Sequence, residues 1–197
     1  MKPLPKQARA RQKRRSLITA AQQCFVADGF DVTTAKSIAE QAGVATGTFY
    51  QYFDNKEDIL RIVAAQRMTE LDKQLPEAAF PVAQEQSKDV SELFLEVLEL
   101  IYQFHQEAPE LHQVLEQRRD NDPALAEILD AGEAKLQERV LAFVRRFNPS
   151  DAETIAFNLF AMAEGIVHRH VFREAPQSKQ QTLKLGAEML ASYFKQI

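Results

Sequence analysis

Apolar side chains recur along this chain at the three- and four-residue spacing of an α-helix, and runs of β-branched residues are missing. Ala, Leu, Glu and Gln are abundant while glycine is scarce, a composition that favours helices. The helical period is lost at residues 73–87, predicted as a linker, and at 148–150, whereas residues 1–7 are predicted as a flexible tail. The pattern therefore predicts an all-α fold, with helices over residues 8–27, 34–41, 46–53, 56–71, 88–107, 109–119, 123–146, 151–172 and 179–195.

The predicted helix ends carry suitable capping residues. Gly29 and Gly43 each follow a helix, at positions where a positive φ is expected. Thr33 is the predicted N-cap of the second helix. Asn55 is the predicted N-cap of the fourth helix, with Asp58 three residues later in a position that resembles a capping box.

Residues 33–56 are the segment around which the other N-terminal residues are organised. They give two short helices joined by a tight turn, with Ala39 small where the helices must cross and Val44 and Phe49 apolar where they pack together. This arrangement is typical of a helix-turn-helix, whose second helix enters the major groove of DNA. The alternative is a pair of surface helices in an ordinary α-domain.

Charge is distributed unevenly along the chain. The 197 residues carry a net charge of −4, but the first 60 hold nine Lys/Arg and six Asp/Glu, while the remainder holds 15 and 22. Basic residues crowd segment 11–15, in the first half of the first helix, where positive charge opposes the helix dipole. We therefore interpret this segment as a contact with DNA phosphates or the edge of the minor groove; the alternative is a solvated basic face.

Several kinds of site find no support in the sequence. Cys24 is the single cysteine, which excludes an internal disulfide and a cysteine-rich metal cage. No apolar run reaches membrane-spanning length and no secretion signal follows the basic N-terminus, so the chain is expected to be cytoplasmic and to contact no membrane. We find no catalytic arrangement, no Glu-x-x-His pair of the di-iron type and no cofactor motif, which leaves a helical-bundle enzyme as a remote alternative.

Three stretches of the N-terminal segment carry a resemblance to a known family. They are GFDVTT at residues 29–34, IAEQAGV at 38–44 and GTFYQYFDNKEDIL at 47–60. Together they strongly resemble the TetR family of bacterial one-component transcriptional regulators. The resemblance covers about the first third of the chain and implies a three-helix DNA-binding domain over residues 1–60, followed by a helical bundle over 61–197 for effector binding and dimerisation.

The resemblance also implies which residues contact DNA. Tyr50 and Lys56 would bind phosphates, and Gln51 alone has the amide geometry for a two-bond contact to adenine. Ala45 departs from the family pattern, which commonly has Ser or Thr as the N-cap at this place. The full predicted set is Arg14, Arg15, Thr34, Thr46, Gly47, Thr48, Tyr50, Gln51, Tyr52 and Lys56.

A pocket for an unknown small-molecule effector is expected in the bundle. Glu164 and His168 are four residues apart on one helix and are either an effector-binding pair or a surface or interface ion pair. His105 continues an apolar face, which is also the pattern of a core histidine. The candidate effector residues are Tyr102, His105, Arg118, Phe160, Glu164 and His168.

The last two helices are apolar over a wide arc, which indicates that each buries more than one face. One face would serve the protomer's own core and the other a second copy, in a four-helix homodimer interface; the alternative is burial within a monomer. The sequence leaves open which face is which. The predicted interface residues are Ile155, Leu159, Met162, Ile166, Leu183, Leu190 and Phe194.

The resulting functional prediction is a ligand-responsive DNA-binding regulator. It would repress transcription by binding a palindromic operator as a dimer and would be released by a small-molecule effector, as the family resemblance implies. A DNA-binding regulator that is controlled by a partner protein, or that activates transcription, stays open as an alternative.

Overall fold

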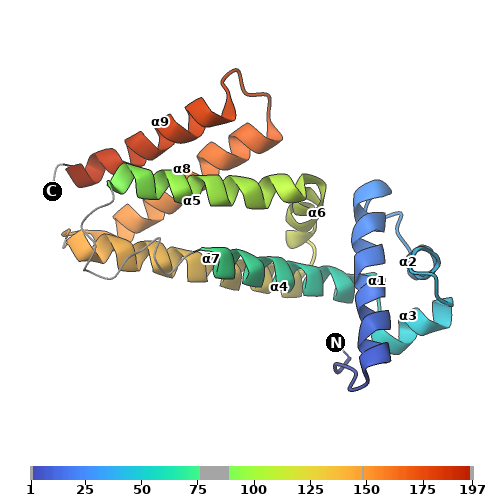
Figure 1. Ribbon diagram of the computed structural model, residues 1–197. Helices are drawn as coiled ribbons and strands as arrows, with labels where there is room; N and C mark the ends of the chain where they lie inside the picture. The colour runs from blue at the N-terminus through green and yellow to red at the C-terminus, as the bar shows by residue number, and fades with distance from the viewer. Residues whose placement is uncertain (1, 76–88, 148, 196–197) are drawn as a thin grey trace. The chain divides into compact units, whose positions relative to one another are not determined.

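The computed structural model describes residues 2–75, 89–147 and 149–195, and every regular element within these ranges is a helix. This confirms the predicted all-α fold (Figure 1). The elements are α1 (Ala8–Ala27), α2 (Ala35–Gln41), α3 (Thr46–Tyr52), α4 (Lys56–Gln74), α5 (Val90–Glu107), α6 (Pro109–Arg119), α7 (Pro123–Val144), the 3₁₀ turn η2 (Arg145–Phe147), α8 (Ala152–Phe172), α9 (Lys179–Ser192) and the 3₁₀ turn η3 (Tyr193–Lys195).

The helices form two compact units. The first, which we call the reader unit, comprises Met1–Met68 and Glu110–Asp130; the second, the body unit, comprises Thr69–Pro109 and Ala131–Ile197. Segment 110–130, which holds the start of α7 and all of α6 except Pro109, therefore clusters with the N-terminal helices, although the sequence assigned it to the bundle. The division into functional domains at residue 60 stays a prediction.

The reader unit has a continuous apolar core drawn from α1 to α4. Leu17, Ile38 and Phe49 are fully buried in it, so α1, α2 and α3 each contribute an inward-facing residue. Phe25 packs on Phe30 with ring centroids 5.0 Å apart, which brings the segment after α1 back onto the core. This small core fixes how α3 is held against α1 and α2.

The N-cap of α2 is Thr34, one residue later than predicted. Its hydroxyl accepts a hydrogen bond from the main-chain N–H of Ser37 (3.1 Å), and the Ser37 hydroxyl accepts one from the N–H of Thr34 (2.9 Å), which completes a capping box. Thr33 is instead buried and donates its hydroxyl to the carbonyl of Gly29 (2.8 Å). The prediction of Thr33 as the cap was wrong because Thr33 closes the preceding loop.

The other predicted turn features are present. Gly29 and Gly43 have φ of 86° and 66°, the left-handed conformation that favours glycine. Asn55 accepts a hydrogen bond from the N–H of Asp58 (2.9 Å) at the start of α4. Ala45 is the N-cap of α3 and provides no side-chain hydrogen bond there, as its methyl group requires.

The body unit is built on α5, α8 and α9, which pack against one another. Their buried residues form one cluster with the end of α7, and its aromatic centre is made by Phe94, Phe143 and Phe194. The ring centroids of these three lie 5.3–5.9 Å apart. Large apolar groups of this kind dominate the energetics of such a core.

Most helix bounds agree with the sequence prediction to within a few residues. α4 continues to Gln74 and α5 begins at Val90, while the predicted linker lies mostly in segment 76–88, outside the described residues. Of the predicted break at 148–150, the first residue also lies outside them. None of the described helices is both long and apolar enough to span a membrane.

Candidate nucleic-acid interface and effector cavity

The recognition-helix candidate α3 is held by one deeply buried ring and presents polar groups elsewhere. Phe49 is fully buried, and the neighbouring Tyr50, whose ring packs edge-on against it, is 53% exposed. Gly47 and Gln51 are also exposed, and three more of the predicted DNA-contacting residues are half-buried: Thr46, Thr48 and Tyr52. The exposed side of α3 therefore offers the amide of Gln51 and the hydroxyl of Tyr50. At Gly47 a ligand can approach the main chain closely.

Lys56, predicted to bind a phosphate, is bonded to the protein itself. Its ammonium donates to the main-chain carbonyls of Phe30 (2.6 Å), Asp31 (3.1 Å) and Thr33 (2.9 Å). The nitrogen also lies 4.5 Å from the centroid of the Phe30 ring. An ammonium has three N–H donors, and these carbonyls occupy all three. Lys56 thus fixes the loop between α1 and α2.

The two arginines predicted on α1 differ in environment. Arg14 is half-buried, with its guanidinium 5.3 Å from the centroid of the Phe53 ring, and burial lowers its pKa. Arg15 is exposed and, with Arg11, lines a groove of about 640 Å³ between α1 and the end of α2. Arg14 thus packs α1 against α3, and Arg15 is the more accessible cation.

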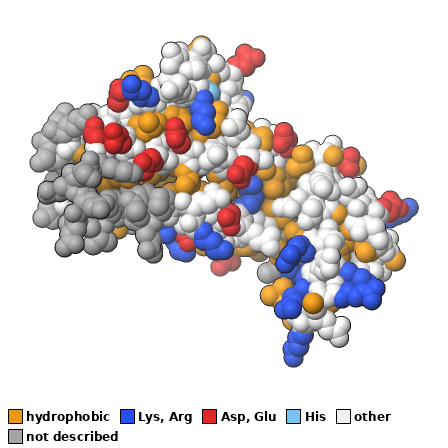
Figure 2. Space-filling view, in the orientation of Figure 1, with side chains coloured by type: hydrophobic (Ala, Val, Ile, Leu, Met, Phe, Trp, Pro, Cys, Tyr) orange, Lys and Arg blue, Asp and Glu red, His pale blue; other side chains and the backbone are white. Residues whose placement is uncertain are grey.

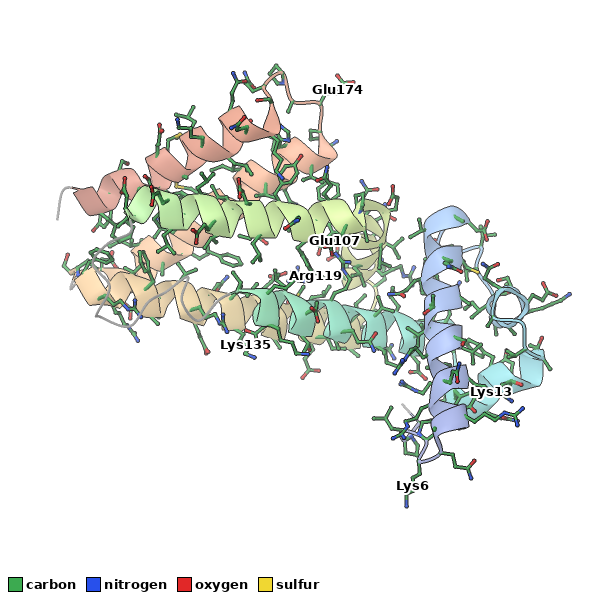
Figure 3. All side chains as sticks on the ribbon, in the orientation of Figure 1. Lys6, Lys13, Glu107, Arg119, Lys135 and Glu174 are labelled. Carbon is green, nitrogen blue, oxygen red and sulfur yellow. The ribbon has the colours of Figure 1, made fainter. Side chains whose placement is uncertain are left out.

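Basic residues are frequent in the first half of α1, with Arg11, Lys13, Arg14 and Arg15 close together. Figure 2 shows Lys and Arg side chains gathered over the N-terminal helices on the displayed face. The labelled side chains of Lys6 and Lys13 extend outward from this region in Figure 3. Positive charge of this kind attracts phosphate without reading sequence.

Arg118, predicted to bind an effector in the bundle, belongs to the reader unit. Its guanidinium lies 4.9 Å from the centroid of the Phe30 ring and 3.4 Å from the carboxylate of Asp31. The Phe30 ring therefore contacts two cations, Arg118 and Lys56. The sequence placed Arg118 wrongly because helical periodicity says nothing about which distant loop a helix meets.

A second polar contact of the reader unit escaped the sequence reading. The Nε of Arg61 donates to both carboxylate oxygens of Asp122, at 3.1 and 3.0 Å, and Asp122 is 5% exposed. Asp122 also accepts from the N–H of Leu125 (3.1 Å), as an N-cap of α7 does. An Asp that precedes a helix-starting Pro is a capping signal visible in the sequence. The ion pair with Arg61, 61 residues away, has no local sequence signal.

The body unit contains an apolar cavity of about 60 Å³. Leu98 and Ile101 of α5 and Phe160 of α8 are among its lining residues, and the polar groups that reach it come from Arg139 and Glu164. Arg139 is paired with Asp72 (3.2 Å) and donates to the carbonyl of Leu75 (2.9 Å). Of the predicted effector residues, Phe160 and Glu164 line this cavity.

Two other predicted effector residues, His105 and His168, contact each other. Nδ1 of His105 lies 2.7 Å from the carbonyl of Ile101, so it carries a proton, and Nε2 of His105 lies 2.9 Å from Nε2 of His168, where one of the two nitrogens donates to the other. Burial lowers the pKa of His168, against an opposing effect of Glu133. This pair favours the core-histidine interpretation over direct lining of the cavity.

Tyr102 also makes protein contacts of its own. Its hydroxyl lies 3.1 Å from Nδ1 of His170, and the ammonium of Lys179 lies 4.4 Å from its ring centroid. It connects α5 to the end of α8 and the start of α9. Tyr102, His105 and His168 therefore do not line the cavity. They lie on α5 and α8, close to the turns of these helices that do.

The predicted dimer residues divide between the core and the surface. Ile155 and Ile166 are half-buried against the body core, and Met162 is 42% exposed. The other four are buried in the protomer's own core and cannot form a surface without unpacking it: Leu159, Leu183, Leu190 and Phe194. Besides Met162, exposed apolar side chains lie at other positions of α8, α9 and η3: Phe157, Leu185, Met189 and Tyr193.

Comparison with known proteins covers both parts of the chain. Residues 17–63 match the family described as "Bacterial regulatory proteins, tetR family". Residues 89–193 match "Tetracyclin repressor-like, C-terminal domain". The second match spans more than half of the chain and includes most of the body unit.

Curated relatives are similar over about a third of the chain. The chain is 35% identical over 65 residues to the HTH-type transcriptional regulator HbdR of Aromatoleum sp. (strain CIB), covering 33% of this chain and 28% of the relative. It is 39% identical over 67 residues to the fatty acid metabolism regulator protein of Bacillus subtilis (strain 168), covering 34% of each. The matched stretch thus spans about a third of these relatives' length.

A solved structure extends the likeness to the whole fold. A TetR-family transcriptional regulator from Mesorhizobium loti MAFF303099 superposes with a TM-score of 0.76 at 20% sequence identity. The match covers 95% of this chain and 97% of the other. At this identity the likeness shows the shared fold of reader and body helices.

Proposed function

Since the chain belongs to the TetR family of bacterial regulatory proteins, we propose that it is a transcriptional regulator that binds double-stranded DNA through α3. The observation that carries this proposal is the exposed polar face of α3, anchored by the buried Phe49 ring. Gln51 is the residue suited to read a base, while Tyr50 and Arg15 would bind phosphates. Lys56 supports this surface by fixing the preceding loop.

We also propose that the regulator acts as a homodimer. A two-fold reader contacts two half-sites about 34–36 Å apart, which a single α3 cannot do. The exposed apolar residues of α8 and α9, with Met162, Leu185 and Met189 among them, flank a groove of about 620 Å³ and supply the face that a second copy would cover. This face replaces the buried residues that the sequence suggested.

The proposed effector site is the apolar cavity of the body unit. Its lining favours a molecule with an apolar portion, and Glu164 and Arg139 offer polar groups for the other end. An effector that binds only the state with low DNA affinity would release the operator, and a coupling of about 1–3 kcal/mol is usual for such systems. Because a relative is named as a regulator of fatty acid metabolism, acyl compounds of graded length are the first effectors to test.

Fluorescence anisotropy with DNA from the protein's own promoter region tests the DNA-binding proposal. We expect the observed affinity to fall steeply as salt rises, and the double variant Tyr50→Phe/Gln51→Ala to bind at least tenfold more weakly. Lys184→Ala, an exposed lysine of α9, is the matched control and is expected to bind like wild type. Binding without salt dependence, or an unaffected double variant, would contradict the proposal.

The dimer proposal is tested by the mass of the protein in solution. Leu185→Glu/Met189→Glu places two charges on the exposed face and is expected to give a monomer by light scattering at micromolar concentration, with the helix content unchanged. A wild-type monomer under the same conditions, or a double variant that stays dimeric, rules out this face as the interface.

A further inference from the structure

The residues that precede α1 are in contact with the recognition-helix candidate. The ammonium of Lys2 donates to the main-chain carbonyls of Tyr50 and, at 3.4 Å, Phe53, and lies 3.3 Å from the carboxylate of Asp54. These three groups mark the end of α3. The segment that the sequence predicted as a flexible tail is thus tied at one end to α3 and at the other to α1.

The contact has a clear electrostatic basis. The last carbonyls of a helix lack partners within the helix and carry partial negative charge, which an ammonium satisfies. Asp54 adds a full negative charge at the same place. The Lys2 side chain is 33% exposed, so part of it is desolvated by this contact. Lys2 therefore holds residues 2–7 beside α3.

Residues 2–9, which are the segment before α1 and the first two residues of α1, form a basic arm. Lys2, Lys6 and Arg9 are its cations, and no acidic residue occurs before Asp28. Lys6 and Arg9 are exposed, and Figure 3 shows the labelled Lys6 side chain extending away from the ribbon. Pro3 and Pro5 restrict the backbone and limit the entropy that ordering the arm on a ligand would cost.

We infer that this arm is a second DNA-binding element, in which Lys2 positions the segment and Lys6 and Arg9 bind the minor groove next to the major groove that α3 enters. The inference rests on the proposed DNA-binding function. A recognition helix contacts bases mainly through its N-terminal residues, which leaves its C-terminal end at the phosphate strand that borders the groove. The arm begins there, and the groove across that strand is the minor groove.

Charge fits this placement. Because Lys2 holds one end of the segment at α3 and α1 holds the other, the arm would meet a minor groove about 6 Å wide as a loop that presents the exposed side chains of Lys6 and Arg9. A narrow A·T-rich minor groove has enhanced negative potential, which attracts lysine and arginine side chains. The arm would thus add affinity and a preference for A·T pairs in the flanks of the operator.

Salt-dependent anisotropy with the full chain tests the contribution of the arm. Lys6→Ala/Arg9→Ala is expected to reduce affinity at least tenfold and to lower the slope of log affinity against log salt by about two, one for each lost cation. Arg173→Ala/Lys184→Ala, which removes one arginine and one lysine from exposed positions of the body unit, is the charge-matched control and is expected to keep the wild-type affinity and slope. A double variant with the wild-type affinity and slope would overturn the inference.

Hydroxyl-radical footprinting first locates the part of the operator flanks that the arm protects. Base analogues placed there then show which groove the arm contacts. Inosine·C resembles A·T in the minor groove and G·C in the major groove. Wild type is expected to bind A·T and inosine·C flanks alike and G·C flanks several-fold more weakly, and Lys6→Ala/Arg9→Ala is expected to lose this preference. Equal binding of inosine·C and G·C flanks, both weaker than A·T, would overturn minor-groove binding.

The positioning role of Lys2 needs its own variants. Lys2→Gln is expected to weaken binding and to reduce flank preference, and Lys2→Arg to restore both because it keeps the charge and the donors. If Lys2→Gln lowers the thermal stability but leaves flank preference intact, Lys2 only caps α3 and this part of the inference fails. If wild type shows no salt-dependent DNA binding at all, the proposed function fails instead.

Discussion

The reader unit and the body unit are held together by different kinds of contact. In the reader unit, charged side chains reach across the fold to carbonyls or carboxylates, as Lys56 does to the loop after α1 and Arg61 to Asp122. In the body unit, the largest cluster is apolar, with three phenylalanines at its centre and an apolar cavity in its wall. Hydrogen bonds are directional, whereas apolar packing depends mainly on volume.

This difference fits the two tasks proposed for the units. A DNA-reading helix must be held in one position, because base contacts have narrow geometric requirements. An effector site must accept a ligand and change shape, which apolar side chains allow without leaving polar groups unpaired. The comparison therefore predicts that the two units respond differently to substitution.

The largest expected effect is in the body core. Leu183→Ala removes a side chain that is 1% exposed, and we expect the free energy of unfolding to fall by about 2–5 kcal/mol. Urea unfolding at a fixed protein concentration measures this. Val32→Ala, at a side chain that is 72% exposed and outside the proposed dimer face, is the control and should have little effect on stability. A Leu183→Ala variant that loses dimerisation at full stability would instead support the original interface prediction.

The second effect tests the polar contacts of the reader unit. Asp122→Asn keeps the shape but removes the charge that pairs with Arg61, and the free energy of unfolding should fall by about 2–3 kcal/mol at neutral pH. Asp130→Asn, which alters an exposed partner of Arg119, is the control. An equal response of the two variants would contradict the special role of the buried pair.

The same variant has a defined pH dependence. Burial raises the pKa of Asp122, but hydrogen bonds from Arg61 and from the main-chain N–H of Leu125 outweigh it and hold the pKa below its ordinary value. A carboxyl with a lowered pKa stabilises the fold above its unfolded pKa of about 3.9 and loses this effect as pH falls. The stability difference between wild type and Asp122→Asn should thus be constant from about pH 5 to 8 and shrink below about pH 4.

A smaller effect distinguishes a structural from a DNA-binding lysine. Lys56→Met keeps the length of the side chain but loses three hydrogen bonds, and we expect a loss of about 1–3 kcal/mol of unfolding free energy. Lys36→Met, on the exposed side of α2, is the control. If Lys56→Met were fully stable and lowered the salt slope of DNA binding by about one, the result would support the phosphate-binding prediction.

The smallest expected effect is a gain. Ala45 has the extended conformation of an N-cap, with φ −68° and ψ 145°, but no hydroxyl to satisfy the first N–H groups of α3. Ala45→Ser should stabilise the reader unit by about 0.5–1 kcal/mol, visible as a higher unfolding midpoint. Ala45→Val is the control, since valine adds bulk at this exposed position but no hydrogen-bond acceptor. A destabilised Ala45→Ser would show that this backbone position is constrained by something other than capping.

The sequence predicted local features well because neighbouring residues determine them. The turns at Gly29 and Gly43 and the cap at Asn55 each depend on a few adjacent positions, and all three are present. The cap at Thr33 failed by one residue because two threonines are adjacent and only tertiary contact shows which of them closes the loop.

Long-range contacts were beyond the sequence for a physical reason. Lys56 bonds to carbonyls 23–26 residues away, and main-chain carbonyls carry no residue-specific signal. Arg118 was assigned to the wrong unit for the same reason. In α8 and α9 the apolar arc was visible, but a helix that is apolar over a wide arc does not reveal which side faces its own core.

Lys56 also has a consequence for how freely the reader unit can vary. Because its ammonium bonds to main-chain oxygens, the side chains of the loop that it holds are not needed for this contact. Val32 is 72% exposed, so its replacement should leave the loop in place, whereas Gly29 is restricted by its positive φ. In a saturation mutagenesis library selected for folded protein, position 32 should accept most residues, and positions 29 and 56 very few.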